Sequence, residues 1–361
     1  MMQRALIATR KGLFELERSA AGWQVAATHF LGEPVSMALH DGRDGTLYAA
    51  LNLGHFGVKL HRRDPGADAW TEVAVPVYPA KPADSDDPVE WKLKLLWSLE
   101  AGGADEPGVL WAGTLPGGLF KSADRGASWQ LVQSLWDLPQ RRNWMGGGYD
   151  VPGIHSICVD PRDSKRLLVA ISCGGVWRTE DGGATWTSSA KGMRADYMPP
   201  EQSEEESIQD PHRVVRCAGQ PDVLWCQHHC GIWRSNDDGR SWQQVRAPVS
   251  SFGFAVACDP ADGARAWFVP AEADQRRVPT DAALAVNRTA DGGNGFDTLR
   301  AGLPQAHCYD LVYRHGLAVA DDGRTLMMGS TTGGVWASDD GGTNWQEVST
   351  TLPPVYAVRF A

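Results

Sequence analysis

The sequence has no long apolar segment and no excess of positive charge. None of its 361 residues belong to a run approaching the roughly 18 apolar residues of a transmembrane helix. The apolar run at residues 5–8 is too short for the hydrophobic part of a signal peptide. Asp and Glu number 44 against 34 Lys and Arg, a net charge of −10 at pH 7. Because nucleic acids and anionic membranes bind positive surfaces, we expect neither as a partner.

The sequence also lacks a Cys-x-x-Cys pair. Its seven cysteines are an odd number, without the spacing of a disulfide-stabilised scaffold. Cys226 and Cys230, the nearest approach to such a pair, are four residues apart. Reduced thiols and the missing signal segment together predict a cytoplasmic protein. Hydrophobic residues make up 42% of the chain, which is enough for a packed core.

An internal repeat is the main feature that the sequence does contain. The pattern Ser/Thr-x-Asp-x-Gly-x-x-Trp occurs four times, and a fifth copy has Phe in place of Trp. The five copies begin at Ser122, Thr179, Ser235, Thr289 and Ser338. Two more degraded copies end at Trp23 and Trp70. Successive terminal aromatic residues are 47 to 59 residues apart, so the chain holds seven related units.

Short β-segments flank each copy of the motif. In one unit, a strand of small and apolar residues at 167–172 precedes a Gly-rich turn and a second strand at 174–179. The Asp carboxylate can accept backbone N–H bonds two residues further on, and the Gly supplies a positive φ. The Trp can fill space between neighbouring sheets. We therefore predict that the motif fastens a β-hairpin and has a structural role.

Units of about 50 residues with four short strands are typical of β-propeller blades. The chain starts with what corresponds to a second strand, residues 5–10, and ends with an isolated first strand, residues 355–360. That last strand would complete blade one and close the ring. We predict an all-β fold, a seven-bladed β-propeller that forms a single domain over residues 1–361.

The repeats resemble the Asp-box, or BNR, repeats of the sialidase-like superfamily, and the resemblance covers nearly the whole chain. It implies a propeller, but the superfamily includes sialidases, other glycosidases, sorting receptors and a photosystem assembly factor. A sialidase of this type requires an Arg-Ile/Leu-Pro motif near its start, and this sequence has none. The nearest tripeptide, Arg277-Val278-Pro279, lies far along the chain. Such sialidases also have six blades, so sialidase activity is not expected.

Histidines dominate the loops where a propeller usually binds its ligand, at one mouth of the central channel. Those loops lead into each innermost strand or connect the second and third strands. Imidazole is the commonest metal ligand, and convergent histidines suit Zn, Mn, Fe or Cu. We predict a divalent transition metal held by some of His155, His212, His228, His229 and His307. Adjacent residues of an extended chain point to opposite faces, so only one of His228 and His229 would ligate. Alternatively, these histidines line a wet channel and hydrogen-bond to loops.

Charged and aromatic residues of the same loops complete the predicted site. Arg10, Lys11 and Arg213 are candidates for binding a carboxylate or phosphate of a substrate, or they pair with nearby acids. The candidate catalytic acids and bases are Asp210, Tyr309 and Asp310; the alternative is a turn cap, as at Asp210-Pro211. Trp144 and Tyr149, in an insertion at 135–153, would stack on a sugar or simply pack their loop against a blade.

These features predict a metal-assisted enzyme that acts on a carbohydrate or small anionic substrate at the channel mouth. The reaction would be hydrolysis by a metal-activated water, or β-elimination beside a carboxylate in a lyase. The alternative is a non-enzymatic scaffold for protein interaction or assembly, which the acidic balance permits. Metal binding by the mouth histidines distinguishes the enzyme from the scaffold.

Overall fold

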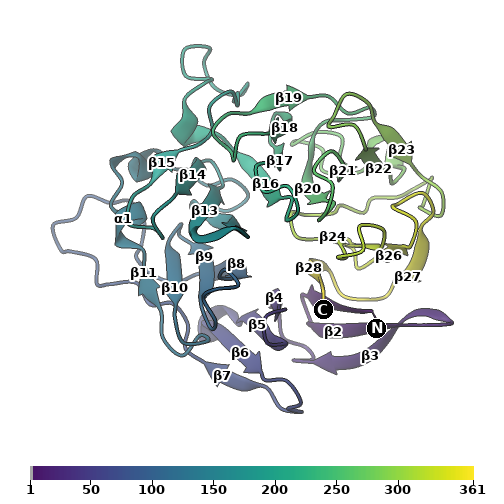
Figure 1. Cartoon of the computed structure of the whole chain (residues 1–361), viewed down its shortest axis with the longest axis horizontal. Helices are drawn as coiled ribbons and strands as arrows, with labels where there is room; N and C mark the ends of the chain where they lie inside the picture. The colour runs from purple at the N-terminus through teal and green to yellow at the C-terminus, as the bar shows by residue number, and fades with distance from the viewer. Residues whose placement is uncertain (1–2) are drawn as a thin grey trace. The chain divides into compact units, whose positions relative to one another are not determined.

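The computed structural model describes residues 3–361, which form seven four-stranded antiparallel sheets (Figure 1). They belong to two compact units. One is Leu39–Pro211, and the other runs to Ala38 and resumes from His212 to Ala361. Seven such sheets are the blades of a seven-bladed β-propeller, so the predicted fold class is confirmed. Within residues 3–361, no helix has the length and apolar character needed to cross a bilayer.

Four sheets belong mainly to the unit that includes the C-terminus. In strand order the first is β28 (Val355–Phe360), β1 (Arg4–Thr9), β2 (Gly12–Ser19) and β3 (Gly22–His29). The second is β16 (Pro211–Arg216), β17 (Leu224–His228), β18 (Gly231–Ser235) and β19 (Gln243–Val245). The third is β20 (Gly253–Cys258), β21 (Ala266–Pro270), β22 (Val286–Thr289) and β23 (Asp297–Leu299). The fourth is β24 (Leu317–Val319), β25 (Leu326–Gly329), β26 (Val335–Ser338) and β27 (Gln346–Ser349).

Three sheets belong mainly to the unit Leu39–Pro211. The first is β4 (Val35–Asp41), β5 (Thr46–Asn52), β6 (Val58–Arg63) and β7 (Thr71–Val73). The second is β8 (Leu95–Ala101), β9 (Leu110–Leu115), β10 (Leu119–Ser122) and β11 (Gln130–Leu131). The third is β12 (Ile154–Asp160), β13 (Asp163–Ile171), β14 (Gly175–Thr179) and β15 (Thr187–Ser188). The short helices of this unit are η1 (Gly54–Phe56), α1 (Gln133–Trp136), η2 (Pro139–Asn143) and η3 (Glu206–Ile208). The helix η4 (Thr280–Ala282) belongs to the unit that includes the C-terminus.

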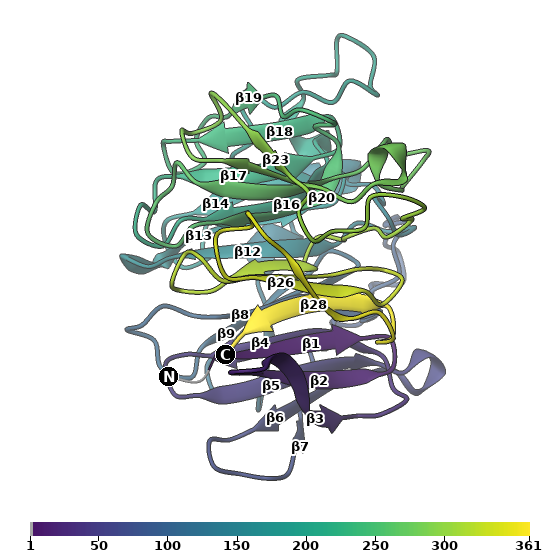
Figure 2. The same cartoon turned by 90° about the vertical axis from the view of Figure 1, so that its right-hand side faces the viewer.

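The two ends of the chain share one sheet. β28 pairs antiparallel with β1, with Ile7 opposite Val358 and Ala8 opposite Ala357. Figure 2 shows the yellow C-terminal strand beside the purple β1. The apolar run at residues 5–8 is fully buried, as expected of a strand that is covered on both faces. Without β28, β1 would be an edge strand with unpaired backbone groups.

The repeated motif closes the turn between the third and fourth strands of five sheets. In the copy between β10 and β11, the Ser122 hydroxyl donates to Asp124 Oδ1 at 2.8 Å and accepts the Gly126 N–H at 2.9 Å. Asp124 Oδ1 also accepts the Ser128 N–H at 2.8 Å. Gly126 has φ 84°, which other residues rarely adopt. The same Asp contacts recur at Asp181, Asp237, Asp291 and Asp340. The motif is therefore a local hydrogen-bonded fastener.

The aromatic residue that ends the last motif packs between two sheets. Trp345 lies in one hydrophobic cluster with Trp267 of β21 and Trp336 of β26. Trp267 also donates its indole N–H to the Gly341 carbonyl at 2.9 Å, inside the motif of the neighbouring sheet. The motif at residues 338–345 thus closes its own hairpin and also contacts the adjacent sheet.

Candidate functional site

Two of the predicted metal ligands, His212 and His229, lie side by side. His212 is the second residue of β16, and His229 directly follows β17. Their ring centres are 5.5 Å apart and their planes are inclined by 78°. His212 is only 2% exposed, whereas His229 is half-buried. The pair therefore has one ring held inside the protein and one closer to solvent.

Asp210 precedes this pair along the chain. Pro211 alone separates it from His212, so the local backbone sets the spacing of the two residues. One ligand atom each of Asp210, His212 and His229 lies within 4.8 Å of the others. Asp210 is 4% exposed, and its Oδ1 accepts the Cys173 N–H at 3.1 Å. A carboxylate with two imidazoles is a ligand set found for zinc and for non-haem iron, with further coordination positions left open.

A backbone carbonyl orients the ring of His212. His212 Nδ1 lies 2.6 Å from the carbonyl oxygen of Gly253 at the start of β20. Because a carbonyl oxygen can only accept, Nδ1 carries a proton, so a neutral ring would bind a ligand through Nε2. Histidines that ligate metals typically use their second nitrogen in this way. Phe254 stacks on the same ring at 4.4 Å and 12°, which fixes its plane.

His228 points away from His229. It is fully buried, its Nδ1 accepts the Cys230 N–H at 3.0 Å, and its ring centre is 4.6 Å from that of Trp233. Consecutive side chains at the end of an extended strand diverge, which separates the two adjacent histidines. His229 is thus the member of the pair that stands beside His212.

The other two predicted histidine ligands lie outside this group. His155 is buried in β12, with Nδ1 2.9 Å from the Ser156 hydroxyl and its ring centre 5.4 Å from Trp97. His307 is exposed and has φ 53°. Among residues 3–361, the only group of three potential metal ligands so arranged is Asp210, His212 and His229. The structure therefore brings together a subset of the histidines that the sequence singled out.

Asp310, a predicted catalytic residue, holds a loop. Its Oδ1 accepts the Ser330 hydroxyl at 2.5 Å and also that of Thr332. Its Oδ2 lies 3.2 Å from the Cys308 thiol, and burial together with this carboxylate raises the pKa of Cys308 to about 11. The thiol therefore stays protonated. Tyr309 is exposed.

The predicted substrate-binding residues have varied surroundings. Arg10 and Lys11 are exposed in the turn between β1 and β2, and Arg213 is buried in β16. Trp144 is buried in a hydrophobic cluster with Trp177, so its ring packs the insertion onto a blade. Tyr149 is exposed and meets Trp97 edge-on at 5.0 Å.

The residues around the buried Phe254 ring carry no functional signal in the sequence. Tyr313 packs edge-on against it at 4.9 Å, and the guanidinium carbons of Arg277 and Arg314 lie 5.4 and 5.5 Å from its centre. These residues come from β20, from the connection between β21 and β22, and from the segment before β24. No local motif links them, so only packing reveals that they share a ring with His212.

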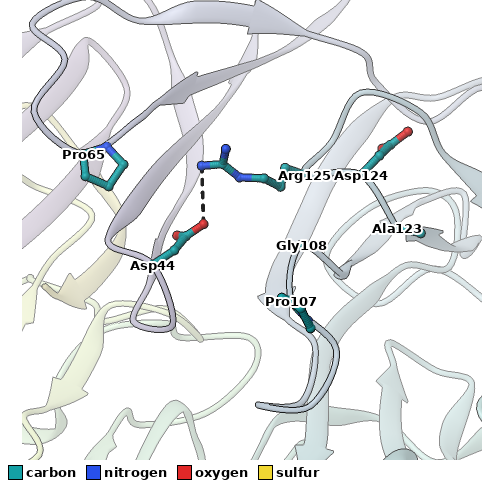
Figure 3. A pocket seen from close by; sticks show the side chains of 7 residues that line it. All are labelled: Asp44, Pro65, Pro107, Gly108, Ala123, Asp124 and Arg125. Atoms are coloured by element: carbon teal, nitrogen blue, oxygen red, sulfur yellow. Dashed lines mark ion pairs between the residues drawn. The ribbon is translucent and has the colours of Figure 1, made fainter.

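A separate open pocket of about 530 Å³ lies in the unit Leu39–Pro211 (Figure 3). Its lining residues are Asp44, Pro65, Pro107, Gly108, Ala123, Asp124 and Arg125. Arg125 pairs with Asp64 at 2.6 Å and with Asp44 at 3.3 Å, so its charge is already compensated. Asp124 is engaged in the repeated motif. This pocket contains none of the predicted site residues.

No protein-family model matches the chain. Among curated proteins, it is similar to xyloglucanase Xgh74A of Acetivibrio thermocellus, with 26% identity over 163 residues, or 41% of this chain and 18% of that protein. It is also similar to a xyloglucanase of a Paenibacillus species, with 22% identity over 302 residues, or 74% of this chain and 28% of that protein. The matched part thus spans less than a third of either relative.

Among solved structures, an ancestral GH74 enzyme matches 88% of this chain and 38% of its own, with 15% identity and a TM-score of 0.62. YCF48 bound to D1 peptide matches 90% of this chain and 84% of its own, with 15% identity and a TM-score of 0.57. At such identities, the likeness shows the fold alone.

Proposed function

We propose that this chain is a metal-assisted carbohydrate hydrolase whose metal is bound by Asp210, His212 and His229. One observation carries the proposal: three potential ligand atoms lie within 4.8 Å of one another, and the buried His212 ring already commits its Nδ1 to the Gly253 carbonyl. A buried imidazole whose second ring nitrogen donates to a backbone carbonyl is typical of a metal ligand.

Each ligand has a defined role in the proposed site. His212 binds through Nε2, because Nδ1 carries the proton donated to Gly253. His229 supplies the second nitrogen from the more exposed side. Asp210 supplies an oxygen and contributes the charge that stabilises a divalent cation. A metal held by these three residues would supply an activated water as the nucleophile for hydrolysis. Zn, Mn, Fe and Cu remain the candidate metals.

The two xyloglucanase relatives support a carbohydrate as the substrate and hydrolysis rather than elimination as the reaction.

We also propose that the repeats are Asp-box repeats of the sialidase-like superfamily, supported by the hydrogen bonds at Asp124 and its counterparts. The seven cysteines are all free thiols, which supports a reducing, cytoplasmic location.

The test begins with metal content by mass spectrometry on protein purified without a His tag. We expect near-stoichiometric metal in the wild type and its loss in both His212→Ala and His229→Ala. His55→Ala is the matched control, because His55 is exposed and its ring packs on Phe56. The same proteins are then assayed for release of reducing ends from xyloglucan and other polysaccharides, and activity should follow metal content. A wild type that binds none of Zn, Mn, Fe or Cu would exclude this function.

A second candidate function is peptide binding by a non-enzymatic scaffold. The observation that favours it is the match to YCF48 bound to D1 peptide, which extends over 84% of that chain rather than over a minor part. A protein without metal or hydrolase activity that binds members of a synthetic peptide array saturably would support the scaffold.

A further inference from the structure

A second open pocket, of about 490 Å³, lies in the unit that includes the C-terminus. It is lined by residues of β18, by the edge strand β19 with the residue that follows it, and by the repeated motif between β22 and β23 of the next sheet. No Asp or Glu among residues 3–361 lines this pocket, whereas Arg234 and Arg246 do. Its volume is in the range of small-molecule sites. None of the proposed metal ligands belongs to it.

The guanidinium of Arg234 is held at this pocket by the motif of the next sheet. Its Nη1 donates to the Gly292 carbonyl at 3.4 Å, and its central carbon lies 5.3 Å from the centre of the Trp225 ring. Gly292 has φ 75°, and a Cβ at that position would collide with Arg234 Nη1. The glycine therefore leaves the space that the charged group occupies.

Arg234 has no counter-ion, unlike the basic residues at the same position of other sheets, directly before the Ser or Thr of the motif. No Asp or Glu of residues 3–361 forms an ion pair with Arg234. Burial lowers the pKa of Arg234, and the more distant Asp262 offsets this only in part. An arginine stays protonated at neutral pH, so this charge is not compensated locally. The equivalent residues do form ion pairs: Lys121 with Glu106, Arg178 with Glu180, and Arg288 with Asp297.

The strand register shows what replaces the counter-ion. Arg288 stands opposite Asp297 in the pairing of β22 with β23, and the two side chains form an ion pair at 2.8 Å. Arg234 has the same place in the pairing of β18 with β19, but the residue opposite it is Gln243. Opposite residues of an antiparallel pair share a face, so a neutral carboxamide stands where the other sheet has a carboxylate. Arg234 Nη2 has no hydrogen-bond partner among the described residues, which leaves it able to donate to a ligand.

We propose that this pocket binds the phosphate group of a phosphorylated small molecule, with Arg234 as the main contact. A phosphate monoester carries nearly two negative charges at neutral pH and three acceptor oxygens. Arg234 donates from Nη2, and the exposed Arg246, which forms no ion pair within residues 3–361, supplies the second charge. The Gln243 carboxamide adds a neutral donor. The pocket is separate from the proposed metal centre, so this inference does not depend on the proposed function.

The experiment measures binding of D-glucose 6-phosphate by calorimetric titration, with D-glucose as the neutral counterpart and D-gluconate as the carboxylate counterpart. We expect the phosphate ester to bind about tenfold or more tightly than either, since charged hydrogen bonds provide such a difference. Inorganic phosphate should compete with the ester, and added salt should weaken its binding. Arg234→Gln should remove the preference, and Arg234→Lys should keep only part of it because lysine lacks the planar fork.

Gln243→Asp provides the sharpest variant, because it retains Arg234 and supplies the counter-ion that Asp297 gives to Arg288. It should weaken binding of the ester by about tenfold, as a competing carboxylate does. Gln243 is exposed, so the fold should be unaffected, and circular dichroism checks this for each variant.

Arg288→Gln is the matched control, because Arg288 holds the equivalent position but is already paired. It should bind glucose 6-phosphate like the wild type. A wild type that shows no preference for the ester over glucose would overturn the inference, as would unchanged binding in both Arg234→Gln and Gln243→Asp. Gluconate bound as tightly as the ester would overturn the assignment to phosphate.

Discussion

His212 Nδ1 lies 2.6 Å from the carbonyl oxygen of Gly253, and this contact places a proton on Nδ1. The carbonyl belongs to the first residue of β20, whereas His212 belongs to β16. One strand therefore sets the tautomer of a side chain on another. The next residue, Phe254, stacks on the same ring and sets its plane. Two consecutive residues thus supply both constraints on His212.

Replacing Phe254 should weaken metal binding without removing a ligand. Phe254→Leu deletes the parallel stacking partner of His212, so the ring can turn and Nε2 loses its fixed direction. We expect metal affinity to fall by about 10- to 100-fold, the usual effect of losing an orienting contact. Competition with a chromogenic chelator measures the change. Phe268→Leu, on β21 and packed against Trp225, is the control for lost core volume. Equal affinity in both variants would contradict the role of Phe254.

The repeated motif should contribute stability through its hydroxyl. Ser235 is buried; it donates to Asp237 Oδ1 at 2.7 Å and accepts the Gly239 N–H at 2.9 Å. Ser235→Ala removes the buried hydroxyl that makes both hydrogen bonds, which should lower the free energy of unfolding by about 1–3 kcal/mol. Urea denaturation measures this loss. Thr350→Ala, at an exposed site, should stay within about 0.5 kcal/mol of the wild type. An unfolding free energy of Ser235→Ala equal to that of the wild type would contradict a stabilising role for this hydroxyl.

Acid should destabilise the protein through the motif carboxylates. The pKa values of Asp124, Asp181, Asp237, Asp291 and Asp340 are all lowered in the folded state. For Asp181, hydrogen bonds from the Thr185 hydroxyl and N–H lower the pKa from 3.8 to about 2. A lowered pKa stabilises the fold above the unfolded-state value, and that contribution is lost as pH falls through the folded-state value.

The melting temperature should therefore decline steeply as pH is lowered from about 4 to about 2, the interval set by Asp181. Thermal unfolding followed by circular dichroism at a series of pH values measures the decline. Asp181→Asn removes one titrating group and should flatten the dependence in this interval. An identical pH profile for the variant and the wild type would show that this carboxylate does not couple protonation to folding.

A buried ion pair between Asp87 and Arg141 anchors the insertion at residues 135–153. Asp87 and Arg141 have side chains 1% and 7% exposed, with 2.5 Å between Asp87 Oδ2 and Arg141 Nη2. Asp87 Oδ2 also accepts the Trp91 indole N–H at 2.8 Å. Asp87→Ala leaves Arg141 buried without its counter-ion, which should cost about 3–5 kcal/mol of stability. Its neighbour Asp86 is 92% exposed and pairs with Arg142, so Asp86→Ala should change stability little. Urea denaturation measures the free energy of unfolding of both variants. An equal loss in Asp87→Ala and Asp86→Ala would contradict a special role for the buried pair.

The fold was accessible from the sequence because its signals are local. The contacts of Ser122, Asp124 and Gly126 span only a few residues, so the same motif residues form the same turn in each copy. Their recurrence reveals the blade period, and the apolar strand left over at residues 355–360 indicates where the first sheet is completed. The role of Trp144 could not be predicted from the sequence. An aromatic residue in an insertion gives the same signal whether it packs against a blade, as Trp144 does, or stacks on a sugar.

The sequence by itself determined the seven repeats, their hairpin turns and a pool of histidines in the connecting loops. Only the tertiary structure decided which of those histidines meet. His229 reaches His212, whereas the adjacent His228 turns to Trp233, because consecutive residues of a strand point to opposite faces. The Gly253 carbonyl, the Phe254 ring and Arg277 join them from other strands and loops. Their proximity depends on the packing of one sheet against the next, which leaves no trace in any local stretch of sequence.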